Sequence, residues 1–279
     1  MIGDPINRRP YFLGLDLQSK QARPCGVCGA HGSMTKAHVP PQSSGNTGLV
    51  TRRRIRSTGE GTLSPGPDNI GGIWVRGLCG TCNSLAGGRY DAAYAEFADD
   101  VLAWALRSSP TLVPNNVPPV RVYPGPVSRS VLYGMYAISP HLRVLFPALA
   151  ASLRDGEDSI ALPVGMRLRM AIYLASQARV AGPIHAQKVL GGASSFESFA
   201  EIFFPPFAWV LESDQGDQSA LRAWADLSEW PLYGQDMSLD LRLLVGHVPT
   251  VSHPLADSDS WIQMFSDQIT PMVEGTVSL

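Results

Sequence analysis

The arrangement of the four cysteines is the feature that most constrains this chain. They form two Cys-x-x-Cys pairs, Cys25 with Cys28 and Cys79 with Cys82, and the sequence contains no other cysteine. A two-residue spacer lets both thiolates of a pair turn toward one ion, and two pairs complete the tetrahedral set that zinc prefers. The long segment between the pairs costs little, because loop-closure entropy grows slowly with length. We therefore predict one closed, structural Zn²⁺ site.

Two other uses of cysteine fit this sequence less well. Disulfides are typical of exported proteins, and the first residues of the chain show no apolar signal core. A redox pair is expected in a thioredoxin-like setting, which surrounds neither pair. No apolar stretch approaches the roughly 20 residues of a membrane helix. We expect a cytoplasmic protein with no membrane partner.

Charge is distributed unevenly along the chain, although the formal net charge is only −2. Residues 1–90 contain 11 Lys and Arg but 4 Asp and Glu, a net of +7, whereas the remainder carries a net of −9. A basic first third is compatible with a polyanion partner, because phosphate contacts supply most non-specific nucleic-acid affinity. Chance clustering of solvated charges is the alternative.

Composition divides the chain into three parts. Residues 1–107 hold every cysteine, and residues 108–127 are rich in proline, which removes amide donors and blocks helix formation. We predict a linker or an extended crossover there. Residues 128–279 are expected to form a mixed α/β domain of unknown role, through which the protein could form homo-oligomers. That part has no metal-ligand cluster, glycine-rich phosphate loop or nucleophile motif.

Hydrophobic periodicity predicts the main elements. Apolar side chains from Tyr90 to Trp104 recur at helical spacing, and this stripe is most simply a core-packing face. Strands are expected at residues 48–55 and 73–75 in the first module. In the remainder we expect helices at 130–138, 166–180 and 219–228, and strands at 120–123, 207–212 and 241–245.

Two further motifs accompany the cysteines. The segment Thr-Lys-Ala-His-Val-Pro-Pro at residues 35–41 lies between the pairs, and Asn83 follows the second pair directly. This order of knuckle, His-hydrophobic-Pro, knuckle and Asn resembles the HNH endonucleases, the zinc-knuckle branch of the ββα-metal nucleases, over about residues 25–105. The resemblance implies an α+β fold in which a zinc-stapled ββα-metal module precedes the mixed α/β domain.

The resemblance also implies roles for three residues. His38 matches the general base, and an imidazole suits this task because its pKa lies near neutrality. Asn69 is the best match for the asparagine that orients this histidine. Asn83 matches the ligand of a catalytic divalent ion, Mg²⁺ or another, which would stabilise charge on the scissile phosphate. The implied activity is hydrolysis of DNA phosphodiester bonds.

The chain departs from the family pattern at Ala37. Many HNH proteins have Asp, Glu or His immediately before the general base, and that side chain also holds the ion. An alanine cannot ligate, and hard cations favour carboxylate oxygen. Either Asp68 or Asp91 supplies a carboxylate from elsewhere, or the module is a degenerate zinc-stabilised unit that binds nucleic acid or protein without cutting.

The strongest basic feature lies between the two cysteine pairs. A phosphate clamp is predicted from a run of arginines with two possible helpers, namely Arg52, Arg53, Arg54 and Arg56 with Arg76 and Arg89. A solvated basic loop is the alternative. No aromatic residues alternate with the run, so a stacking platform for single strands is not indicated.

Overall fold

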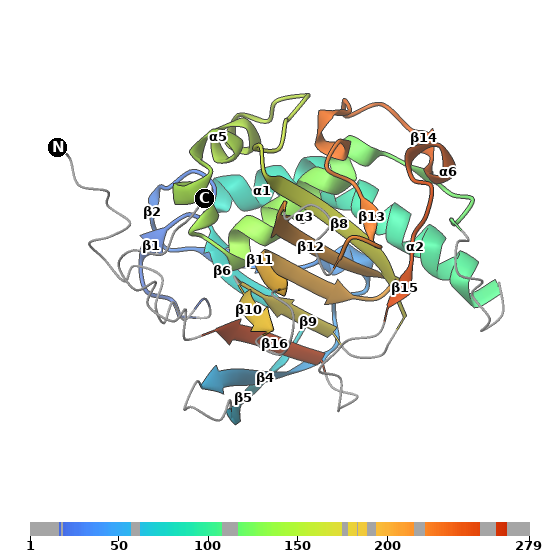
Figure 1. Ribbon diagram of the computed structural model, residues 1–279. Coiled ribbons are helices and arrows are strands. Elements are labelled where there is room, and N and C mark those ends of the chain that lie inside the picture. The colour runs from blue at the N-terminus through green and yellow to red at the C-terminus, as the bar shows by residue number, and fades with distance from the viewer. Residues whose placement is uncertain are drawn as a thin grey trace.

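The computed structural model describes residues 17, 19–56, 62–107, 117–174, 178–182, 184–188, 194–214, 221–251 and 261–266. For residues 49–56, 62–70, 184–188, 194–197 and 261–266 the description covers the backbone. These parts form a mixed α+β fold, as the sequence predicts. A large curled sheet, resembling half of a barrel, carries the main helices on one face (Figure 1).

The first module contains a strand pair that leads directly into a helix. Its elements are β1 (Arg23–Pro24), β2 (His31–Gly32), β3 (Thr35–His38), the 3₁₀ helix η2 (Gln42–Ser44), β4 (Leu49–Arg56), β5 (Thr62–Ile70), β6 (Trp74–Leu78), α1 (Gly80–Arg89) and α2 (Asp91–Arg107). Strands β3 and β6 are antiparallel and place His38 opposite Trp74. Because β6 ends next to Cys79, the cysteine pair, the strand pair and α1 are held at fixed positions relative to one another.

The rest of the chain supplies most of the large sheet and a buried helix. Its elements are β7 (Arg121–Val122), α3 (Pro124–Ile138), α4 (Leu142–Leu145), α5 (Pro147–Asp155), β8 (Met166–Tyr173), β9 (Ala178–Ala181), β10 (Ile184–Lys188), β11 (Ser194–Phe204), β12 (Phe207–Ser213), β13 (Ala225–Asp226), η4 (Trp230–Leu232), β14 (Leu239–Asp240), α6 (Leu241–Leu244), β15 (Thr250–Val251) and β16 (Trp261–Ser266).

The large sheet joins strands from distant parts of the sequence. Its order is β13-β8-β12-β11-β9-β16-β4-β5, with β10 beside β11 and β15 beside β8. Strand β16 lies parallel to both β9 and β4. The hairpin of β4 and β5, which belongs to the first module, therefore extends the sheet formed by the C-terminal part (Figure 1).

One side of the sheet and the helices share a continuous core. Successive β12 residues point to opposite faces, as the period of two in a strand requires: Phe207 and Trp209 pack in the main core, and Ala208 and Val210 pack on the other face. The ring of Phe97 in α2 stacks on Phe207 with centroids 4.6 Å apart. Residues from both sides of the predicted 108–127 linker thus contribute to one core, and the division into two domains stays a prediction.

Three of the expected elements in the C-terminal part are wrong. Residues 166–173 form strand β8, residues 225–226 form strand β13, and residues 241–244 form the short helix α6. In β8 the sequence Met-Arg-Leu-Arg-Met alternates apolar and charged side chains, and Leu168 is buried while Arg167 is partly exposed. This alternation of apolar and charged residues is typical of a half-buried strand and not of a helix. Helices α2 and α3 and strands β4, β6, β7 and β12 match the other expected elements. Helix α3 begins at Pro124, inside the proline-rich stretch in which no helix was expected, because proline is tolerated in the first turn of a helix.

Candidate metal centre and the cavity beside it

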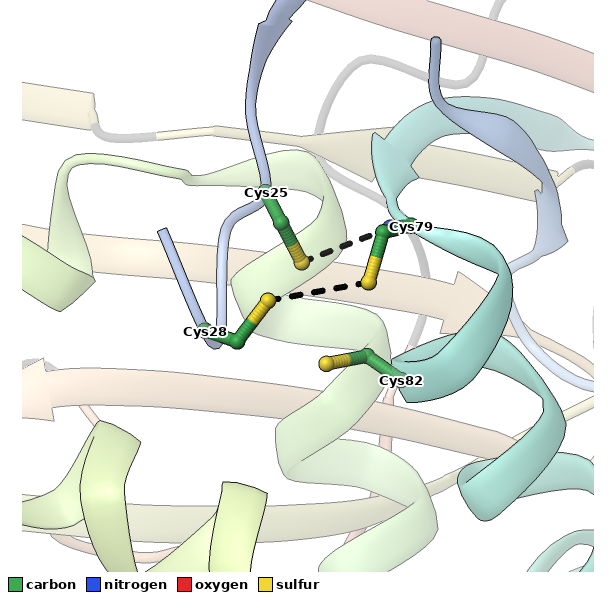
Figure 2. Close-up of side chains that lie close together, drawn as sticks. All are labelled: Cys25, Cys28, Cys79 and Cys82. Atoms are coloured by element: carbon green, nitrogen blue, oxygen red, sulfur yellow. Dashed lines mark hydrogen bonds between the residues drawn. The ribbon is translucent and has the colours of Figure 1, made fainter. Parts of the chain in front are cut away.

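The four cysteines converge as the sequence predicts. Their Sγ atoms all lie within 4.8 Å of one another, and Cys25 and Cys82 are buried (Figure 2). Among the residues that the structure describes, this is the one cluster of three or more His, Cys, Asp or Glu side chains with metal-ligand spacing. All four thiols are free of disulfide bonds.

Backbone hydrogen bonds hold the two cysteine pairs together. The first pair lies in a turn between β1 and β2, which is closed by the bond from the Gly29 N–H to the Cys25 carbonyl at 3.0 Å. The Gly26 N–H donates to the Gly77 carbonyl at 2.7 Å and so ties this turn to β6. Cys79 caps the N-terminus of α1, and its N–H donates to the Cys25 sulfur at 3.3 Å.

The electrostatics of the cluster favour a bound dication. A hydrogen bond from Cys82 lowers the pKa of the Cys25 thiol to about 4, and the same bond raises the pKa of Cys82. Burial raises the pKa of Cys28. Negative charge is therefore favoured on the buried Cys25 sulfur, while the thiols of Cys28 and Cys82 are held in the protonated form. A Zn²⁺ ion held by all four sulfurs would stabilise four thiolates at once and leave no open coordination position.

A cavity of about 290 Å³ is lined by Leu78 and Asn83, the residues that directly flank the second cysteine pair. Its lining includes His38 from β3, Asn83 from α1, Asp91 from α2 and Ser130 from α3. Asn83 follows the cluster residue Cys82 in the first turns of α1, so the position of the cluster also fixes that of Asn83. The structure thus brings His38 and Asn83 together, 45 positions apart in the sequence, at one cavity.

The imidazole of His38 has a defined orientation in this cavity. Its Nε2 lies 3.0 Å from the Gly71 carbonyl oxygen. A carbonyl only accepts hydrogen bonds, so Nε2 carries the proton of the neutral ring and Nδ1 keeps its lone pair. Burial lowers the pKa of His38, with the charge of Lys36 acting in the same direction and the Gly71 bond and Asp91 opposing it. The ring is therefore neutral at pH 7.

Asn83 presents its side-chain oxygen as a potential ligand. The Asn83 Nδ2 donates to the Lys36 carbonyl at 3.2 Å, which fixes the amide group while Oδ1 has no hydrogen-bond partner among the described residues. Ala37, between Lys36 and His38, is buried and also lines the cavity. The position before His38 contributes a methyl group and no ligand atom.

Asn46 is a structural residue that the sequence did not reveal, and its side chain lies between Pro40, after β3, and Ile73, before β6. Asn46 is fully buried, and its Nδ2 donates to the carbonyls of Pro40 and Ile73 at 2.6 and 2.9 Å. Its Oδ1 accepts from the Ile73 N–H at 2.7 Å. These three bonds join the segment after β3 to the segment before β6. An Asn five residues after the Pro-Pro pair that ends the 35–41 motif was the available signal.

The remaining candidate residues lie at several places. The backbone of Asn69 pairs with Val50 in the β4–β5 hairpin, but its side chain is outside the described part of the structure. The same holds for the arginines of β4, that is Arg52, Arg53, Arg54 and Arg56. Arg76 is half-buried, donates to the Met34 carbonyl at 3.0 Å and lies over the Trp74 ring. Arg89 is exposed at the last residue of α1.

Comparisons of this chain with protein-family models, with curated proteins and with solved structures find no significant match. In the described segments, the helices are too short or too polar to cross a membrane.

Proposed function

We propose that the protein is a metal-dependent endonuclease of the HNH type, which hydrolyses DNA phosphodiester bonds and uses zinc only to hold its structure. One observation carries the proposal: His38 and Asn83, the two best-matched residues of the motif, line the same cavity beside the four-cysteine cluster. The order of β3, β6 and α1 supports it, because the resemblance implies a strand pair followed by a helix at this place.

The proposed chemistry assigns a separate task to each side chain. His38 takes a proton at Nδ1 from the water that attacks phosphorus, a role for which its lowered pKa keeps it neutral. The Oδ1 of Asn83 is a ligand for a divalent ion. That ion, when bound, supplies charge stabilisation at the scissile phosphate and the leaving oxygen. The basic character of residues 1–90 supports DNA as the partner, with the arginines of β4 as phosphate contacts.

Plasmid cleavage tests the enzymatic proposal. The zinc-loaded full chain is incubated with supercoiled plasmid and Mg²⁺, Mn²⁺ or Ni²⁺, next to H38A and the matched control H31A, in which an exposed histidine near the first pair is removed. We expect nicking by the wild type and by H31A, and a rate for H38A that is lower by at least a hundredfold. Equal activity of the wild type and H38A in every metal contradicts the proposal.

A second candidate function rests on Ala37. Because this position offers no ligand, the module also fits a zinc-stabilised unit that binds nucleic acid or protein without cutting it. In that case the wild type and H38A shift duplex DNA equally in a salt-dependent manner and neither cuts it. Cleavage that depends on His38 excludes this reading.

A further inference from the structure

The cavity contains a carboxylate that takes no part in the implied motif. Asp91 is the first residue of α2, eight positions after Asn83, and its side chain lines the same cavity as His38 and Asn83. We propose that Asp91 is the carboxylate ligand of the divalent ion, together with Asn83, and that it replaces the acidic residue that Ala37 lacks. This inference rests on the proposed nuclease function.

The helix geometry places the two oxygen ligands on one face. Asn83 and Gly87 lie four positions apart in α1 and therefore share a side of the helix. A Cβ atom at Gly87 would be 3.7 Å from the Asp91 Oδ2, so this carboxylate oxygen lies directly over the face that Asn83 occupies. Because Gly87 has no side chain, the space between Asn83 and Asp91 stays open.

The carboxylate of Asp91 is anchored at one oxygen only. Its Oδ1 accepts a hydrogen bond from the Ser130 Oγ of α3 at 2.8 Å. Across the described residues, Oδ2 has no hydrogen bond, and Asp91 has no ion pair with Lys, Arg or His. A half-buried carboxylate without a counter-charge is unfavourable, and a hard dication at Oδ2 would remove this cost.

Asp91 is less suited to the other obvious role, which is to orient His38. The imidazole is already held by the Gly71 carbonyl, and the Asp91 Oδ1 accepts from Ser130 instead. Asp91 and His38 both line the cavity, from α2 and β3. Both side chains line one cavity without a hydrogen bond between them among the described residues, as expected of an ion ligand and a base that face the same reacting group.

Binding of Mn²⁺ tests the assignment without a need for cleavage. The zinc-loaded full chain is titrated with Mn²⁺, and free Mn²⁺ is measured by its paramagnetic resonance signal. We compare wild type with D91N, which keeps an oxygen that accepts from Ser130, with H38A, and with the matched control D99N, which alters an exposed carboxylate on the same helix. We expect affinity at least about tenfold weaker in D91N, and affinity within twofold of wild type in H38A and D99N.

Three measurements keep the outcome clear. Zinc content and melting temperature show that D91N is folded, and S130A, which removes the anchor but keeps the carboxylate, should weaken Mn²⁺ binding less than D91N does. Mn²⁺ affinity unchanged in D91N, or absent in the wild type, overturns the assignment of Asp91. The nuclease proposal is tested separately, by plasmid cleavage with H38A. If cleavage depends on His38 but D91N binds Mn²⁺ as tightly as the wild type, only the assignment of Asp91 is wrong.

Discussion

The carbonyl oxygen of Tyr136, near the end of α3, occupies the space beside Gly26 in which any other residue would place its side chain. A Cβ atom at Gly26 would lie 2.2 Å from this oxygen, and a Cβ atom at Gly77 would lie 1.9 Å from the Ala137 carbonyl oxygen. Helix α3 is buried over almost its whole length. The first cysteine pair and β6 therefore pack directly on the backbone of this helix. The cysteine cluster is thus part of the main hydrophobic core, which also contains α3.

Gly26→Ala is expected to destabilise the protein because backbone atoms cannot rotate away as a flexible side chain can. Overpacking of this kind costs typically about 1–3 kcal/mol. The matched control is Gly32→Ala in β2, where an added Cβ has nothing within 4 Å. Thermal unfolding of both variants with zinc bound is the measurement. An equal effect of the two substitutions would show that α3 does not pack on the turn as described.

Removal of the ion from the cysteine cluster should weaken the packing of the first cysteine pair on α3 and so lower the stability of the protein. We expect one zinc per chain by elemental analysis, and Cys82→Ser should lose most of it, since binding energy at a structural site is folding energy. A chelator should lower the melting temperature of the wild type strongly and that of Cys82→Ser little. Zinc-free protein that melts at the temperature of the loaded protein would contradict a structural role.

Asn46→Ala should reduce stability, whereas Asn83→Ala should not. The first substitution leaves the buried Ile73 N–H without its acceptor at 2.7 Å, which costs about 1–3 kcal/mol. The second removes one exposed bond to the Lys36 carbonyl, and such surface changes are usually within about 0.5 kcal/mol. Denaturant unfolding of the two variants measures the difference. A larger loss in Asn83→Ala would mean that the amide of Asn46 does not tie the two segments together.

The sequence predicted the features that depend on local spacing. The convergence of Cys25, Cys28, Cys79 and Cys82 followed from two short spacers and the ligand preference of zinc, and α2 followed from its 3.6-residue periodicity. Neither required knowledge of distant contacts. The clustering of His38 and Asn83 at one cavity is compatible with the motif that suggested their roles.

Features that depend on pairing between distant segments could not be predicted from the sequence. Strand β16 lies between β4 and β9, and no local pattern specifies a parallel pairing across most of the chain. The close approach of α3 to Gly26 likewise depends on where the C-terminal part packs. Asp91 was noted as a possible carboxylate, but its position over Gly87 depends on the break between α1 and α2 at Tyr90.

The titration of His38 gives the last prediction. Burial lowers its pKa below the usual 6.5, the charge of Lys36 acts in the same direction, and Asp91 opposes both. Lys36→Gln should therefore raise the pKa of His38 and Asp91→Asn should lower it, which NMR of the imidazole C–H signals measures without reference to activity. In the wild type, the unfolded chain binds more protons than the folded chain between pH 6.5 and the folded pKa. The contribution of His38 to stability is thus fully present above pH 6.5 and is lost as the pH falls through the folded pKa. His38→Ala should flatten this part of the curve of unfolding free energy against pH. In the NMR titration, pKa shifts of the same sign in Lys36→Gln and Asp91→Asn would show that the two charges do not flank the imidazole as described.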